Sequence, residues 1–146
     1  MTTARDIHDE ANAEEELLTD DEIFGTTLRC IEAWNTLDLD TTLDTYSDDV
    51  IYRDPGTVDR IEGKDDLRRY LTKFFRVWNM QFRVLEDRRI AGANAQVCVW
   101  EADISALTRP DRIITQMGMD IIHVRDGVLT RDEAFIDRLP LQGLLQ

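Results

Sequence analysis

The sequence predicts an α+β domain in which helices come first and long antiparallel strands follow. In the first half, apolar residues recur three and four positions apart, as on the buried face of a helix. In the second half, apolar or alternating runs are separated by short turn sequences, as in a chain of β-strands. Helices and strands that are segregated along the chain in this way are typical of α+β folds.

The first predicted helix begins at Asp21, after a cap at Thr19 or Asp20, and its apolar spacing continues for about 16 residues. Residues 38–46 predict a second, shorter helix with Tyr46 on its inner face. Both helices would place their apolar sides against one core.

Residues 50–54 predict a short strand that Pro55 and Gly56 end, because this pair does not continue a strand ladder. A third helix then opens at Gly63, and its broad apolar face includes Phe75 and Trp78. These aromatic side chains are expected in the core and in the wall of any pocket beneath the helix.

Four longer strands are predicted in the second half. They are residues 81–90, 95–107, 113–124 and 128–137. Their connections are short enough for hairpins, and Asp126-Gly127 is the strongest two-residue hairpin signal in the chain. A mainly antiparallel sheet follows from this pattern.

The 146 residues suit a single domain with one hydrophobic core. Residues 21–146 carry the periodic segments, whereas residues 1–20 are acidic and predict a flexible arm. Since the arm has no apolar period with which to dock, its removal through residue 18 is expected to leave thermal stability nearly unchanged.

The formal net charge is −13, with 30 acidic and 17 basic residues, which argues against nucleic acid or an anionic membrane as a partner. The sequence has no apolar run near the 18 residues that a membrane span needs, and its acidic start does not resemble a signal peptide. We therefore expect a cytoplasmic protein.

Cys30 and Cys98 each lie in an apolar pattern without metal-ligand spacing, so we interpret them as buried free thiols. His8 and His123 are the only histidines and do not form a ligand cluster. With no glycine-rich phosphate loop in the chain, the sequence predicts neither a metal site nor a cofactor site.

Asp120 is the residue that most needs an explanation. Residues 113–124 are apolar on both faces of the predicted strand, so both faces should be covered. An unpaired carboxylate in such a strand costs roughly 2 kcal/mol or more unless it is neutral, paired or facing a polar cavity. The sequence therefore predicts a pocket at Asp120.

Strand parity places Gln116 on the same face as Asp120, and Glu101 and Asp103 share one face of the neighbouring strand. We expect these side chains to point into the pocket together with Asp54. Carboxyl groups that converge on an apolar cavity cannot all ionise, because burial and like charges both raise pKa values. One base and one neutral acid is the natural division.

An ordinary ion pair is the alternative for the two acids of the neighbouring strand. Arg53 or Arg112 could neutralise Glu101 or Asp103 at the surface. This alternative stays open at the level of sequence.

Several short segments also resemble, in order, the pattern of a known family. They are residues 34–40, 46–50, 54–55, 63–65, 126–127 and 135–137. The family is the cone-shaped superfamily of nuclear transport factor, ketosteroid isomerases and SnoaL-like polyketide cyclases, in which a curved sheet and three N-terminal helices enclose a pocket. The resemblance covers residues 21–146 and implies that fold here.

Ketosteroid isomerases imply roles for two residues. Asp120 matches the acid that these enzymes keep protonated to donate a hydrogen bond to the developing oxyanion, and Asp54 matches their proton-shuttling base. Cys30 stands where they carry an oxyanion-binding tyrosine, and a thiol is a weak donor.

Limonene epoxide hydrolase, another relative, gives a second comparison. Tyr52 and Asp103 match its tyrosine and one of its aspartates, while Asp54 replaces its asparagine. Glu101 stands where its arginine belongs, and Ala134 stands where it has a second aspartate. Polyketide cyclases also need an acid at position 134, and alanine has no proton to give, so both mechanisms are disfavoured.

We expect a cofactor-independent acid/base enzyme that moves a proton next to a carbonyl on a small hydrophobic molecule. Asp54 would be the base and Asp120 the neutral donor, with Asp103 and Tyr52 as polar auxiliaries and Glu101, Phe75, Trp78 and Gln116 near the substrate. The alternatives are an epoxide-opening or cyclising enzyme of a biosynthetic pathway and a non-catalytic module for ligand binding or dimerisation.

The outer face of the sheet is predicted to be apolar. Its expected members are Trp100, Ile104, Met117, Met119, Ile121 and Phe135. Because such a patch is unfavourable in water, it predicts a homodimer through the outer sheet face.

Overall fold

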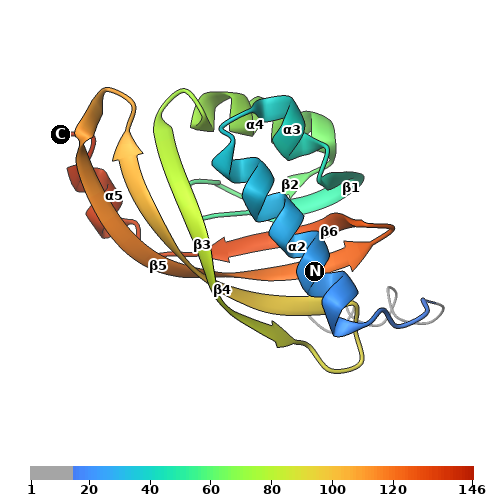
Figure 1. Cartoon of the computed structure of the whole chain (residues 1–146). Helices are drawn as coiled ribbons and strands as arrows, with labels where there is room; N and C mark the ends of the chain where they lie inside the picture. Colours follow the sequence, from blue (N-terminus) through green and yellow to red (C-terminus); the bar gives the residue numbers. More distant parts are fainter. Residues whose placement is uncertain (1–14) are drawn as a thin grey trace.

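A six-stranded, curved and unclosed sheet forms the body of the protein, with helices on its concave side (Figure 1). The computed structural model describes residues 15–146. The predicted α+β class and the cone-shaped arrangement are confirmed. Most of the predicted acidic arm, residues 1–14, lies outside the described residues.

The strands run in the order β2-β1-β6-β5-β4-β3 across the sheet. Their bounds are β1 Tyr46–Arg53, β2 Ile61–Glu62, β3 Trp78–Arg89, β4 Ala95–Ala106, β5 Arg109–Arg125 and β6 Val128–Phe135. Strands β3 to β6 follow one another as antiparallel hairpins. Strand β1 instead pairs in parallel with β6, which brings the end of β1 beside the middle of the sheet.

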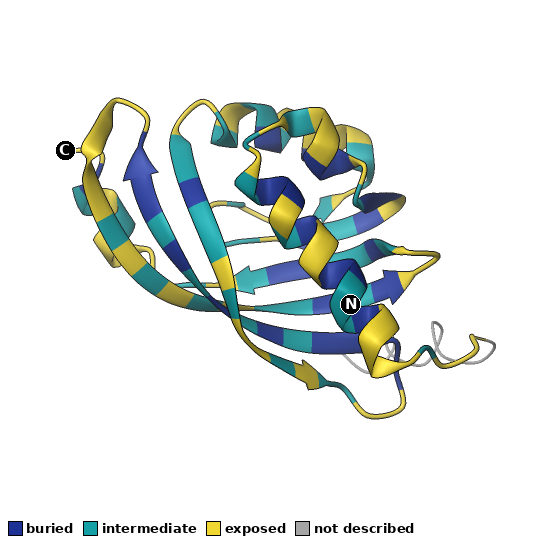
Figure 2. Ribbon diagram, in the orientation of Figure 1, coloured by how far each residue is buried: buried dark blue, intermediate teal, exposed yellow. Residues whose placement is uncertain are grey.

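Four helices accompany the sheet within the described residues. They are α2 Asp20–Asn35, α3 Leu39–Leu43, α4 Lys64–Phe74 and α5 Leu139–Gly143. Helix α2 lies across the concave face, α3 and α4 group at one end of it, and α5 lies beside the beginning of β5 (Figure 1). The buried sides of α2 and α4 face the sheet (Figure 2).

Helix α2 begins with a capping box, because the Thr19 hydroxyl accepts from the Glu22 N–H and the Glu22 carboxylate accepts from the Thr19 N–H. The residues just before this cap are also bound to the domain. Asn94 bridges the Leu18 N–H and the Glu16 carbonyl, and Arg89 donates to the Leu18 carbonyl. Residues 16–18 thus contact the sheet, which differs from the arm expected through residue 20.

The first strand is longer than the sequence predicted. It begins at Tyr46 rather than at residue 50, and Tyr46 is fully buried in the sheet instead of on a helix. Tertiary pairing explains the difference, because Tyr46 lies opposite Leu129 of β6. The two-residue strand β2 and the five-residue helix α5 are too short to leave a periodic signal in the sequence.

Candidate active site

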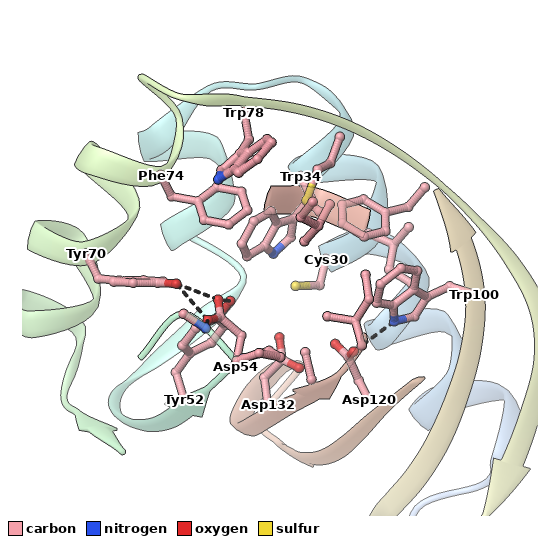
Figure 3. A pocket seen from close by; sticks show the side chains of 18 of the residues that line it. Cys30, Trp34, Tyr52, Asp54, Tyr70, Phe74, Trp78, Trp100, Asp120 and Asp132 are labelled. Atoms are coloured by element: carbon pink, nitrogen blue, oxygen red, sulfur yellow. Dashed lines mark hydrogen bonds between the residues drawn. The ribbon is translucent and has the colours of Figure 1, made fainter. Parts of the chain in front are cut away.

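A cavity lies between the helices and the concave face of the sheet (Figure 3). Four of the residues predicted for the site line it: Tyr52, Asp54, Trp78 and Asp120. The cavity volume is about 160 Å³, close to that of an apolar protein cavity of about 150 Å³ that holds a benzene ring. The space is suited to a small molecule.

Asp54 stands at the end of β1, where the chain leaves the sheet for a turn. Its carboxylate accepts hydrogen bonds from the Tyr52 hydroxyl at 2.8 Å, the Tyr70 hydroxyl at 2.7 Å and the Gly56 N–H at 2.6 Å. Burial raises the pKa values of both tyrosines, so their hydroxyls keep the protons that they donate. Tyr52, Tyr70 and Gly56 all donate to Asp54, an arrangement suited to an ionised carboxylate.

Asp120 faces the same cavity from β5 (Figure 3). Its Oδ1 accepts a 2.8 Å hydrogen bond from the indole Nε1 of Trp100. Trp100 lies opposite Gly118 on the neighbouring strand, and its ring atoms lie 2.5 Å from where a Cβ of Gly118 would be. The missing side chain at Gly118 lets the indole lie flat over β5 and reach Asp120.

Asp132 is the third carboxyl of the cavity, and it comes from β6. Its Oδ2 accepts a 2.6 Å hydrogen bond from the Tyr46 hydroxyl, which accepts in turn from Nε1 of Trp34 at 2.8 Å. The residue is only 4% exposed, and no N–H or O–H of the described residues donates to its other oxygen, Oδ1. The sequence pattern alone did not indicate Asp132 as a site residue.

Asp120 and Asp132 influence each other directly. Burial raises the pKa of Asp120, an effect that hydrogen bonds from Asp132 and Trp100 oppose and the charge of Asp54 reinforces. Burial also raises the pKa of Asp132 well above its ordinary value, and the charge of Asp120 adds to that shift. Two adjacent buried carboxyls each disfavour ionisation of the other, so this pair retains a proton more readily than an isolated aspartate does.

Aromatic rings form much of the remaining wall. Trp34 lies at the centre of this group, with ring centroids 5.5 Å from Phe74, 6.0 Å from Phe82 and 6.4 Å from Tyr52. Cys30 points into the cavity from α2 (Figure 3), and burial raises the pKa of its thiol to about 12. The Cys30 thiol is therefore neutral. The cavity thus combines apolar and neutral walls with a few carboxyl groups.

Glu101 and Asp103 lie on the opposite face of the sheet, so their predicted placement in the pocket is wrong. Their side chains are 38% and 43% exposed, and both form ion pairs with Arg83 of β3. The register of the β4–β5 hairpin decides the matter, because it places Trp100 rather than Glu101 on the face of Asp120. The ion-pair alternative was the right one, although its partner is Arg83 rather than Arg53 or Arg112.

Two other predicted contacts do not line the cavity. Phe75 packs against Trp34 with ring centroids 5.4 Å apart, behind the cavity wall. Gln116 shares the face of Asp120 but donates its amide to the Asp137 carbonyl at 2.6 Å. Trp100 and Ile104, expected on the outer face, are buried on the inner one.

The sequence did not indicate Asp132, Tyr70 or Trp100 as site residues, and the local sequence signals for the three differ in strength. In β6, Asp132 and Ala134 lie two residues apart and both line the cavity, so a correct parity for that strand would have placed Asp132 inside. Tyr70 belongs to helix α4, and nothing local in the sequence indicates that its hydroxyl reaches Asp54. Trp100 could be placed only once the hairpin register was known.

Within residues 15–146, no group of three or more histidine, cysteine or acidic side chains has the arrangement of a metal site. In the same part of the chain, no helix has the length and apolar character needed to cross a membrane.

Comparison with protein families assigns the chain to a class. The model of the SnoaL-like domain family matches residues 28–131, which is most of the described structure. The chain therefore belongs to the SnoaL-like domain family, as the resemblance implied. Among curated proteins, no match to the sequence was found.

Solved structures with the same fold come from several organisms. A proposed isomerase from Bacillus subtilis is 16% identical, with a TM-score of 0.78 over 88% of this chain and 96% of its own. A proposed polyketide cyclase from Xanthomonas campestris is 17% identical, with a TM-score of 0.74 over 88% and 100%. A limonene-epoxide-hydrolase-like epoxide hydrolase from Mycobacterium tuberculosis is 18% identical, with a TM-score of 0.68 over 85% and 90%. These similarities establish the fold.

Proposed function

We propose that this protein is a cofactor-independent acid/base enzyme that transfers a proton next to a carbonyl group of a small hydrophobic substrate. The observation that carries the proposal is the arrangement of carboxyl groups around one apolar cavity. Asp54 is surrounded by donors, whereas Asp120 lies beside a second buried acid. Two environments that separate the protonation states of carboxyl groups are what acid/base catalysis requires.

Asp54 would take the proton from the carbon next to the carbonyl. Its ionised carboxylate is held in place by Tyr52 and Tyr70, so the base is oriented before the substrate binds. Asp120 would donate a hydrogen bond to the carbonyl oxygen as negative charge develops there. Asp54 would then return the proton to another carbon, which completes an isomerisation.

The cavity supports the substrate class. Its aromatic walls favour an apolar ring system, and a volume of about 160 Å³ restricts the size of that system. The B. subtilis structure carries the name of an isomerase, which agrees with this proposal at the level of a shared fold.

Epoxide opening or cyclisation is the second candidate, and Asp132 is the observation that favours it. The sequence argued against this chemistry because position 134 is alanine, but Asp132 supplies a carboxyl from the same strand, two residues earlier. A neutral member of the Asp120–Asp132 pair could protonate an epoxide oxygen. Structures named for a polyketide cyclase and an epoxide hydrolase share the fold.

Deuterium exchange tests the first candidate. The protein would be incubated in D₂O with a panel of small cyclic ketones, including β,γ-unsaturated ones, and exchange next to the carbonyl would be followed by proton NMR. We expect exchange in the wild type and a loss of about 100-fold or more in Asp54→Asn, because a positioned base contributes at least that much.

Asp59→Asn is the matched control, since it makes the same chemical change in the exposed loop after β1 and should exchange at the wild-type rate. Binding of the ketones without exchange would overturn the enzyme proposal in favour of a ligand-binding module. Hydrolysis or cyclisation of epoxides from a parallel panel, without ketone exchange, would favour the second candidate.

A further inference from the structure

Asp120 and Asp132 are neighbours because of the register between β5 and β6. Asp120 lies opposite Ala134, and Asp132 lies opposite Ile122, so the two carboxyls are diagonal neighbours on the concave face. Ala134, which lies opposite Asp120 and on the same face of β6 as Asp132, adds only a methyl group there. In this arrangement the charge of Asp120 acts on Asp132 and raises its pKa.

The donor groups around Asp120 and Asp132 determine the direction of the hydrogen bonds that the pair receives. An indole N–H can only donate, so the Tyr46 oxygen accepts from Trp34 and directs its own proton to Asp132 Oδ2. On the other side, Trp100 donates to Asp120 Oδ1. Donors therefore hold one oxygen of each carboxyl, and no such donor from the described residues reaches Asp132 Oδ1.

A buried oxygen without a donor is costly, by about 1–3 kcal/mol for a neutral group and more for a charged one. A proton between the two carboxyls removes this cost, because Asp132 Oδ1 then either carries it or accepts it from Asp120. No other donor is needed to satisfy the pair.

We propose that Asp120 and Asp132 act as one acid pair that keeps a single shared proton at neutral pH, with Tyr46, held by Trp34, as its positioning residue. The role of the pair toward a substrate rests on the proposed function. The sharing of the proton does not, since it follows from the contacts of the unliganded protein.

During proton transfer, Asp120 would direct the shared proton toward the developing oxyanion. Asp132 then remains as the anion, and the Tyr46 hydroxyl already donates to it. The proton stays within the pair and needs no outside donor. Asp132 thus keeps a proton available to Asp120, and Tyr46 stabilises the charge that is left behind.

Other titratable groups lie around the pair. They are Tyr52 of β1, Asp54 just after β1, Cys30 of α2 and Cys98 of β4, and Arg138 before α5 also lines the cavity. Burial raises the pKa values of both thiols and of Tyr52, so these three groups are neutral near pH 7. The charge of Asp54 favours retention of the shared proton.

The direct test is a carboxyl-carbon NMR titration of the unliganded wild type with labelled aspartate. We expect the Asp120 and Asp132 signals to change together in two separate pH steps, the second above neutral pH, because interacting acids titrate as a pair. Two independent single-step titrations would overturn the proposal, as would loss of both protons below neutral pH.

Asp132→Asn should remove the upper step, so that Asp120 titrates once, at lower pH than the upper step of the wild type. Persistence of that step would show that burial alone keeps Asp120 neutral. Glu133→Gln is the matched control, because Glu133 adjoins Asp132 in β6 but pairs with Arg131. It should leave both steps unchanged.

Tyr46→Phe tests the positioning role. Loss of the hydroxyl removes a bond that stabilises the Asp132 anion, so the lower step should move to higher pH. An unchanged lower step would overturn this role. If the titrations agree with the pair but Asp54→Asn leaves ketone exchange intact, the proposed function fails while the acid pair stands.

Discussion

Asp132 of β6 lies diagonally across the strand ladder from Asp120 of β5, and both side chains face one cavity. Within residues 15–146, neither carboxyl forms an ion pair with a basic side chain. Instead, indole and hydroxyl groups donate to them, Trp100 to Asp120 and Tyr46 to Asp132. The stability that these buried acids contribute should therefore change with pH in the direction opposite to that of an ion-paired carboxylate.

The stability of the fold should therefore depend on Asp132 in a particular direction. Its pKa is raised in the folded protein, so its favourable contribution is complete below the unfolded pKa of about 3.9 and is lost as pH rises through the folded pKa. Asp132→Asn keeps a neutral group of similar shape. We expect its melting temperature, relative to wild type, to be higher at pH 8 than at pH 5, as measured by circular dichroism. A constant difference would contradict the raised pKa.

Gly118→Ala should weaken the link between Trp100 and Asp120. A Cβ at this position would lie 2.5 Å from two ring atoms of Trp100, so the indole must move. We expect a loss of about 1–3 kcal/mol in the free energy of unfolding, the usual cost of overpacking a core. Gly118→Ala should lower the free energy of unfolding by less when it is combined with Trp100→Phe, because a phenyl ring is smaller than an indole. An equal loss in unfolding free energy with and without Trp100→Phe would exclude a clash between the new methyl group and the indole.

Asp103 should behave as a surface ion-pair residue. Hydrogen bonds from Arg83 and Thr115 lower its pKa, so it contributes stability above the usual aspartate pKa of about 3.9, and this contribution disappears as pH falls through the lowered value. Asp103→Asn should lower the melting temperature slightly at pH 7 and not at all near pH 2. A marked loss of ketone exchange in this variant would show that Asp103 belongs to the site after all.

The N-terminal segment provides a test of the fold boundary. Residues 16–18 share three hydrogen bonds with Asn94 and Arg89, each worth about 1 kcal/mol. A chain that begins at residue 19 should melt several degrees below one that begins at residue 15, as measured by calorimetry. Equal melting temperatures would support the sequence-based prediction that removal of the chain through residue 18 leaves stability unchanged.

The homodimer stays a prediction. Met117, Met119 and Phe135 are 62%, 37% and 48% exposed and line a groove on the outer sheet face, a patch that favours burial. We expect a dimer in sedimentation velocity at micromolar concentration and a monomer for Met119→Glu. Leu107→Glu is the control, because Leu107 is also exposed but lies in a hairpin turn away from the groove. A monomeric wild type would contradict the prediction.

The sequence by itself determined the class of fold and the strongest candidate for a buried acid. Periodicity identified α2 and α4, and turn signals separated β3 to β6, because these features depend on neighbours close in the chain. Asp120 could be recognised because a carboxyl in a strand apolar on both faces needs an explanation from any fold. Asp54 was found through the family resemblance and its place before a proline.

Only the tertiary structure decided which acids accompany Asp120. Each strand has two faces, and a shift of one residue in the register exchanges them, so the sequence of β4 was compatible with either Trp100 or Glu101 facing the pocket. The parallel pairing of β1 with β6 then brings Tyr46 to Asp132, 86 residues further along the chain. Contacts of this range leave no local pattern, because they depend on how distant strands are paired rather than on the residues beside them.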